Sequence, residues 1–86
     1  MAARLVTHTE KDKDGDILAL CNPYSDWLRR DKDDAIDDID DKRHSYFVIY
    51  KGKPVDIIVV DDPDGKYLRT DPDQTTSNNL DELPDC

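Results

Sequence analysis

Two runs near the start of the chain show the hydrophobic pattern of a β-hairpin. Residues 4–9 are rich in β-branched side chains, and residues 17–21 are almost entirely apolar. Between them lies Asp14-Gly15, a dipeptide typical of the type I′ turn, whose two central residues both take positive φ. We therefore expect a two-residue turn at this point, which places His8 directly opposite Cys21.

The next periodic segment, residues 31–41, predicts a helix. Asp31 is a suitable N-cap, and Asp34 three residues later gives an acidic variant of the capping box. The apolar positions form one narrow stripe, so we expect one face to pack and the others to be solvated. The stripe consists of Ala35, Ile36 and Ile39, and the remaining directions are taken by Asp33, Asp37, Asp38, Asp40 and Asp41.

Residues 44–50 give the strongest strand signal in the chain, and residues 54–60 give a second strand close behind. A turn at Gly52-Lys53 predicts that Tyr46, Val48 and Tyr50 face Val59, Ile57 and Val55, with Phe47, Ile49 and Ile58 on the other side. Both faces of this pair are then apolar. Because one short helix covers one face, we expect the C-terminal tail or another copy of the chain to shield the other.

The last third contains a turn at residues 62–65, a short strand at residues 66–70 and a polar loop. Asn79 is a candidate cap for a helical turn that carries Leu80 and Leu83. The whole pattern predicts one α+β domain spanning residues 1–86. We expect an antiparallel sheet of four or five strands with one main helix, in the order ββαβββ, followed by a C-terminal tail.

Charge narrows the range of functions. The 86 residues include 21 acidic and 12 basic side chains, a formal net charge of -9, which opposes direct nucleic-acid binding. We see neither a signal peptide nor an apolar run long enough for a membrane span, so we expect a cytoplasmic location. That compartment predicts free thiols at Cys21 and Cys86. The sequence leaves open whether the protein is a monomer or a homodimer.

Catalytic signatures are missing from the sequence, and we predict that the protein is not an enzyme and uses no cofactor. The chain has two histidines, neither in a known nucleophile motif, and no glycine-rich phosphate loop. Residues 10–17 resemble the start of an EF-hand calcium loop, but a hairpin turn accounts for them better. A zinc site is an alternative hypothesis; its candidate ligands, which have no compact spacing, are His8, Cys21, His44 and Cys86.

The leading hypothesis is a non-enzymatic binding or accessory module that contacts another protein. Side chains with directional hydrogen-bonding groups gather around the last strand and its loop, where binding sites are common, although such residues also cap turns locally. These candidates are Lys66, Tyr67, Arg69, Asp71, Asn78 and Asn79. An alternative function uses the acidic helix, residues 31–41, as a nucleic-acid mimic or decoy that binds basic proteins.

Three groups of residues resemble a family of small, mostly bacterial proteins known as domain of unknown function 3892. They are Lys13-Asp14-Gly15-Asp16-Ile17 with Ala19-Leu20, Asp34-Ala35-Ile36 with Asp38-Ile39, and the runs 65–73 and 78–86. The resemblance implies a compact domain along the full chain and supplies no catalytic residues. Relatives often have a less acidic helix, so the aspartates of residues 31–41 depart from the family pattern.

Overall fold

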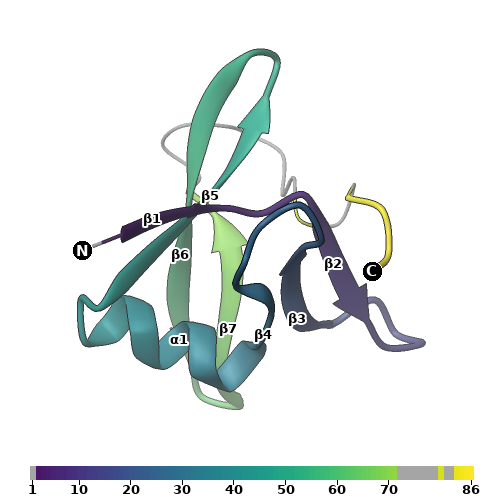
Figure 1. The fold of residues 1–86 in the computed structure, drawn as a ribbon. Helices are drawn as coiled ribbons and strands as arrows, with labels where there is room; N and C mark the ends of the chain where they lie inside the picture. Colours follow the sequence, from purple (N-terminus) through teal and green to yellow (C-terminus); the bar gives the residue numbers. More distant parts are fainter. Residues whose placement is uncertain (1, 72–79, 81–82) are drawn as a thin grey trace.

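A computed structural model of the chain describes residues 2–71, 80 and 83–86. In that part of the chain, seven strands and one helix form two sheets (Figure 1). The elements in order are β1 (Ala2–Leu5), β2 (His8–Lys11), β3 (Ile17–Asn22), β4 (Leu28–Asp31), α1 (Lys32–Asp40), β5 (His44–Tyr50), β6 (Lys53–Asp62) and β7 (Gly65–Thr70).

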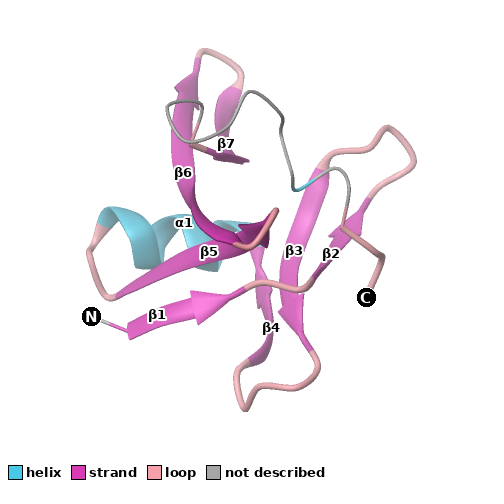
Figure 2. Cartoon of the chain, turned by 90° about the horizontal axis from the view of Figure 1, so that it is seen from above, coloured by secondary structure: helices cyan, strands magenta, loops and turns pink. Residues whose placement is uncertain are grey.

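The two sheets divide the strands unequally. One has the strand order β1-β5-β6-β7, with β1 parallel to β5 and the other neighbours antiparallel. The other is the antiparallel sheet β2-β3-β4, which Figure 2 shows beside the first. The expected fold class was therefore wrong: the protein is mostly β, in the order ββββαβββ, rather than a single antiparallel sheet in the order ββαβββ.

The N-terminal run explains part of this error. Residues 4–9 were expected to form one strand, but the chain changes sheets within them. The Val6 amide donates to the carbonyl of Phe47 (2.8 Å), and the Thr7 amide donates to the carbonyl of Cys21 (3.0 Å). One β-branched run thus supplies β1 to one sheet and β2 to the other, since local strand propensity does not specify a partner.

Strand β4 accounts for the rest of the error. Its four residues pair with β3, from Ala19 opposite Asp31 to Asn22 opposite Leu28. None of the four is buried, and Leu28, Arg29 and Asp31 are exposed. A strand that buries so little carries no apolar alternation in its sequence, so the pattern missed it.

The β2–β3 hairpin has the predicted register and a different turn. His8 lies opposite Cys21, as expected, but the register shifts between Glu10 and Lys11. The turn spans residues 12–16, and the Gly15 amide donates to the carbonyl of Asp12 (3.1 Å). Only Gly15 has positive φ in this turn (87°), which rules out type I′.

The β5–β6 hairpin shows a register error of two residues. Lys51 and Gly52, both with positive φ (51° and 79°), form the turn, and Tyr50 lies opposite Lys53. Because the shift is even, every side chain keeps its expected face. Of the six residues predicted to face one another, Tyr46, Val48, Val55 and Ile57 are buried, and Tyr50 and Val59 are half-buried.

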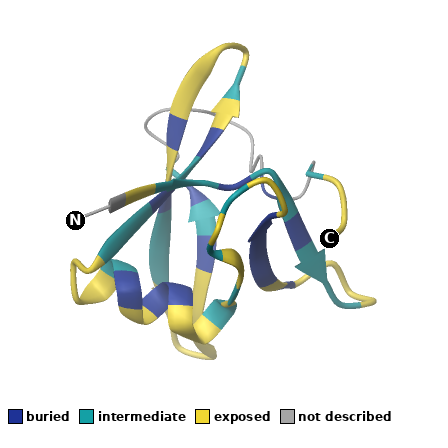
Figure 3. Cartoon of the chain, viewed as in Figure 1, coloured by how far each residue is buried: buried dark blue, intermediate teal, exposed yellow. Residues whose placement is uncertain are grey.

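Helix α1 packs across the inner face of the strands, with Ala35 and Ile36 buried as predicted. Figure 3 shows the same arrangement, with buried positions on the inner side of the helix and an exposed tip on the β5–β6 hairpin. Asp38 is also buried, which corrects the expectation that it points to solvent. The helix is too short and too polar to cross a bilayer, as judged over the described residues.

The outer face of β5 and β6 is apolar, as the pattern indicates. Phe47 and Ile58 are half-buried, and 51% of the Ile49 surface is exposed. Residues 72–79, part of the C-terminal tail expected to shield this face, lie outside the described residues. Leu80 is fully buried in the core, and its carbonyl accepts a hydrogen bond from the Thr9 hydroxyl (3.3 Å).

Candidate functional site

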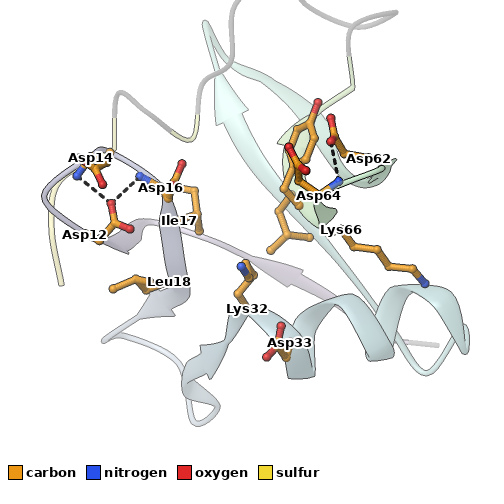
Figure 4. A pocket seen from close by; sticks show the side chains of 14 residues that line it. Asp12, Asp14, Asp16, Ile17, Leu18, Lys32, Asp33, Asp62, Asp64 and Lys66 are labelled. Carbon is orange, nitrogen blue, oxygen red and sulfur yellow. Dashed lines mark hydrogen bonds between the residues drawn. The ribbon is translucent and has the colours of Figure 1, made fainter.

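A groove lies between the β2–β3 turn and the β6–β7 turn, which lie on opposite sides of it (Figure 4). Its volume is about 770 Å³, within the range of typical ligand pockets. The first turn of α1 contributes Lys32 and Asp33 to its wall. We call this feature the acidic groove. Its lining residues are Asp12, Asp14–Leu18, Lys32, Asp33, Asp62 and Asp64–Leu68.

Six aspartates and two lysines line the acidic groove. The aspartates are Asp12, Asp14, Asp16, Asp33, Asp62 and Asp64. They come from two turns and the start of a helix. The fold therefore brings to one groove carboxylates that are up to 52 residues apart in the sequence. The groove therefore has a local negative potential that attracts cations and basic side chains.

The two turns hold their first carboxylates in the same way. Asp12 Oδ1 accepts the amides of Asp14 (2.8 Å) and Asp16 (3.0 Å), and Asp62 Oδ1 accepts the amide of Asp64 (3.0 Å). Both turns also share the order Asp-x-Asp-Gly, at residues 12–15 and 62–65. The repeated Asp-x-Asp-Gly sequence could have indicated that the two turns are related. From the sequence alone, they were expected to be two separate turns.

Apolar and aromatic side chains also line the groove, but Ile17 and Leu68 lie on the opposite strand faces from their neighbours Leu18 and Tyr67. Ile17 and Leu68 are buried, whereas Leu18 and Tyr67 remain 40% and 41% exposed. The groove thus combines an acidic rim with partly exposed apolar side chains along its lining, whose burial is favourable.

Lys66 does not neutralise the rim. Its Nζ donates to Asp40 Oδ2 (2.8 Å), and this hydrogen bond together with the charge of Asp40 raises the pKa of the lysine. In Figure 4 its side chain extends away from the groove toward the helix. The lysine is therefore engaged by α1, and the excess of carboxylates in the groove persists.

The predicted binding residues separate in the structure. Lys66 and Tyr67 line the acidic groove, but they lie on opposite faces of β7 because side chains alternate along a strand. Arg69 shares the outer face with Tyr67, and its Nε donates to the carbonyl of Thr70 (3.2 Å). The Asp71 amide continues the ladder through the carbonyl of Asp56 (2.8 Å), while the predicted residues Asn78 and Asn79 lie outside the described residues.

A second cluster surrounds the buried carboxylate of Asp38, which is 1% exposed. Arg30 Nε and Nη2 donate to its two oxygens (3.0 and 3.1 Å), and the Tyr46 hydroxyl donates to Oδ2 (2.7 Å). Arg4 and Arg43 lie farther away, at 3.9 and 3.6 Å. The cluster joins β1, β4, α1 and β5, so it links the helix to both sheets.

Ionisation of Asp38 is favoured despite its burial. Desolvation opposes the charged form, but hydrogen bonds from Arg30 and Tyr46 outweigh it and lower the pKa of the carboxyl. Burial, followed by the hydrogen bond to Asp38, raises the pKa of the Tyr46 hydroxyl. The apolar stripe of residues 35, 36 and 39 gave no sign that Asp38 is buried. Asp38 nevertheless follows Ala35 by three residues, so it borders the same face of the helix.

Arg4 connects this cluster to two aromatic rings. Its guanidinium carbon lies 5.7 Å from the ring centres of both Trp27 and Tyr46, and its Nη1 donates to the Tyr46 hydroxyl (2.9 Å). Its Nη2 lies 3.3 Å from His44 Nε2. Since a guanidinium only donates, Nε2 is the acceptor of this contact. This environment is closely packed and serves the fold.

The four candidate zinc ligands do not form one cluster. Cys21 and Cys86 are joined in a disulfide with a Cα–Cα distance of 6.3 Å, which corrects the expectation of free thiols. The bond is possible because the Cys86 amide donates to the Thr9 carbonyl (3.2 Å), bringing the C-terminal segment beside β2. His8 lies near them, whereas His44 belongs to the other sheet. Over the described residues, no group of three or more His, Cys, Asp or Glu side chains is placed to hold a metal.

These features define a small, mostly β protein built on two sheets, with one helix and an acidic groove between its hairpin turns. The chain belongs to the family described as protein of unknown function DUF3892, which matches residues 5–84. The resemblance seen in the sequence is thereby confirmed. Comparison with curated proteins and with solved structures finds no match.

Proposed function

We propose that the protein is a non-enzymatic binding module that recognises a basic segment of another protein through the acidic groove. The observation that carries the proposal is the combination of a concave site, six rim carboxylates and two partly exposed apolar or aromatic side chains in the lining. Carboxylates select basic partners and speed their association, while burial of Leu18 and Tyr67 supplies affinity. Two residues predicted for binding, Lys66 and Tyr67, line this groove, although the Lys66 side chain extends toward the helix.

The proposal moves the acidic recognition surface from the helix to the groove. On α1, Asp38 is buried in its own cluster, and Asp40 is paired with Lys66. Asp41, just past the helix, is paired with Arg43 (3.4 Å). The helix therefore offers fewer available carboxylates than its sequence indicates, and we do not adopt the nucleic-acid mimic as a second candidate.

Binding of a short oligolysine peptide at low and high salt tests the proposed function by calorimetry. We expect association that weakens as salt rises, because exposed ion pairs are screened. The double substitution Asp14→Asn with Asp64→Asn should lower the affinity roughly fivefold, since each exposed charge contributes up to about 1 kcal/mol. Neither side chain accepts the hydrogen bonds that shape the two turns.

The matched control is Asp26→Asn with Asp37→Asn, which removes the same charge from exposed positions outside the groove. This variant should bind the peptide within about twofold of the unsubstituted protein. Equal losses in the two double variants would mean that net charge alone attracts the peptide. That result, or the absence of any binding at low salt, would refute the groove as the recognition site.

A further inference from the structure

Strand β2 is an edge strand of the three-stranded sheet, and residues 83–86 cover its outer side. The Thr9 amide donates to the carbonyl of Pro84 (3.0 Å), and the Thr9 carbonyl accepts from the amide of Cys86 (3.2 Å). We call residues 83–86 the strap. Thr9, which these two hydrogen bonds hold, is completely buried. The strap therefore acts as a short additional strand on β2.

Apart from the disulfide, the strap is weakly held. Three of its four residues are exposed and Leu83 is half-buried, so it buries little apolar surface. Lys11 Nζ donates to the carbonyl of Leu83 (2.9 Å), and each such hydrogen bond contributes little net stability. The ion pair between Lys11 and Asp85 (3.6 Å) involves an exposed carboxylate, which water screens. The disulfide is thus the contact that keeps the strap on β2.

The disulfide borders an open hollow at the protein surface. Both of its cysteines line this hollow, whose volume is about 260 Å³, and Glu10, Leu28 and Arg29 contribute to the same lining. Cys86 is exposed, whereas Cys21 in β3 is only 3% exposed. The hollow therefore gives a small thiol a route to the disulfide, with Cys86 as the more accessible end.

The neighbours of Cys21 make it a suitable leaving group. Its cross-strand partners are His8 on β2 and Arg29 on β4. Directly opposite residues share one face of a sheet, so the Arg29 side chain lies on the side to which Cys21 points. A nearby guanidinium favours the thiolate form of a cysteine. Arg29 also binds Glu10 and Asp31, and these carboxylates offset part of that effect.

We propose that the Cys21–Cys86 disulfide is a thiol-exchange site that fastens or releases the strap, independently of the acidic groove. A thiolate of a dithiol reductant attacks the sulfur of Cys86, forms a mixed disulfide there and displaces Cys21 as a thiolate. The second thiol of the reductant then displaces Cys86 and closes the reductant's own disulfide. The two protons of the reductant pass to the two cysteines, so the protein gains two electrons and the reductant loses two.

Release of the strap is local. Leu80 is fully buried in the core, and its carbonyl accepts a hydrogen bond from the Thr9 hydroxyl (3.3 Å), so the chain stays anchored at this position. Reduction uncovers the amide and carbonyl of Thr9. It also frees Lys11 from its contacts with the strap. The oxidised and reduced proteins therefore differ at the edge of β2 and share the same core.

Amide hydrogen exchange of the folded protein, with and without dithiothreitol, tests the release. We expect the amides of Thr9 and Cys86 to exchange about tenfold faster after reduction, because the strap no longer protects them. The amides of β5 and β6, which lie inside the other sheet, should exchange within about twofold of their rates in the oxidised protein.

The matched control is Cys86→Ser, which removes the bond at an exposed position without any reductant. Its Thr9 amide should exchange as fast as that of the reduced protein, and dithiothreitol should not change the rate. Dithiothreitol sensitivity in this variant would show that the reagent acts elsewhere, which would contradict the proposal. The comparison on the unsubstituted protein decides the question even if the variant does not fold.

Reduced glutathione identifies the sulfur that is attacked. After brief exposure of the folded protein, acid quenching and peptide mass spectrometry should place most of the mixed disulfide on Cys86. A mixed disulfide mainly on Cys21 would overturn the assigned direction of exchange.

Three other results would overturn the proposal. If dithiothreitol fails to reduce the protein in the absence of denaturant, the disulfide is closed to thiols. If reduction leaves exchange at Thr9 unchanged, the non-covalent contacts alone hold the strap. If β5 and β6 lose protection as well, the disulfide holds the whole fold and does not act on the strap alone.

Discussion

Asp38 and the aspartates of the acidic groove place the same side chain in opposite settings. Asp38 is buried and accepts hydrogen bonds from Arg30 and Tyr46, with Arg4 and Arg43 nearby. The groove carboxylates lie at turns on the surface, with Lys32 and Lys66 as their nearest basic lining residues. The first setting stabilises the fold, and the second leaves negative charge available to a partner.

The difference follows from where the arginines lie. The chain has five arginines, and three of them approach the single carboxylate of Asp38. None of the five lines the acidic groove. A protein with a net charge of -9 thus places three of its five guanidinium groups around one carboxylate and leaves the groove without any. The two regions should therefore respond in opposite ways to neutralisation of an aspartate.

The largest expected effect is from Asp38→Asn. This change should reduce the free energy of unfolding by about 2–3 kcal/mol, because it leaves Arg30 without its charged partner. The cost is below that of a fully buried pair, since 37% of the Arg30 side chain is exposed. Urea unfolding measures it, with Asp37→Asn on the solvent side of the helix as control. Equal stability of the two variants would contradict a stabilising role for the cluster.

The pH dependence of stability should reveal the same carboxylate. Because the folded-state pKa of Asp38 is lowered, its contribution is present above the ordinary aspartate pKa of about 3.9. It is lost as the pH falls through the lower folded-state value. The stability difference between the unsubstituted protein and Asp38→Asn should therefore narrow below about pH 4. A difference that stays constant from pH 7 into this range would show that the charge of Asp38 contributes nothing.

A smaller effect is expected from Tyr46→Phe. The variant keeps the buried ring but removes the hydroxyl that donates to Asp38 and accepts from Arg4. We expect a loss of about 1 kcal/mol, the net value of a typical hydrogen bond. Combining it with Asp38→Asn should cost less than the sum of the two single changes, since both remove the same contact. Strict additivity in urea unfolding would show that the two groups act independently.

The smallest effect on stability is expected in the groove. Asp14→Asn with Asp64→Asn should change the free energy of unfolding by no more than about 0.5 kcal/mol, because exposed charges contribute little. A slight gain is the expected sign, since removal of two carboxylates reduces repulsion along the rim. Thermal unfolding of the same protein preparations used for binding makes the measurement. A loss comparable to that of Asp38→Asn would mean that the groove aspartates have a structural role.

Much of the local structure could be predicted from the sequence. The pattern located the helix at residues 31–41 and the strand at residues 44–50, and it assigned the inner faces of β5 and β6 correctly. Those elements bury apolar side chains at regular spacing, so periodicity reports them. The sheet arrangement could not be derived in this way, because β1 and β2 share one run and differ only in their partners.

The candidate site was predicted in part, since Lys66 and Tyr67 line the groove while its carboxylates were assigned only to turns. Asp12 and Asp62 are 50 positions apart in the numbering, and only the packing of two sheets brings their turns together. Asp38 was missed for a related reason: an ionised side chain is buried when arginines from other elements surround it. Neither arrangement leaves a signal within a single element.

The parallel pairing of β1 with β5 has a kinetic consequence. Ala2 lies opposite His44, so the first strand finds its neighbour only after a long stretch of chain has been ordered. Closing that distance costs loop entropy before any ladder hydrogen bond forms, a feature of slow-folding topologies. The antiparallel hairpins are local and can form early. In stopped-flow refolding with amide-exchange labelling, the amides of β1 should therefore gain protection after those of β5 and β6.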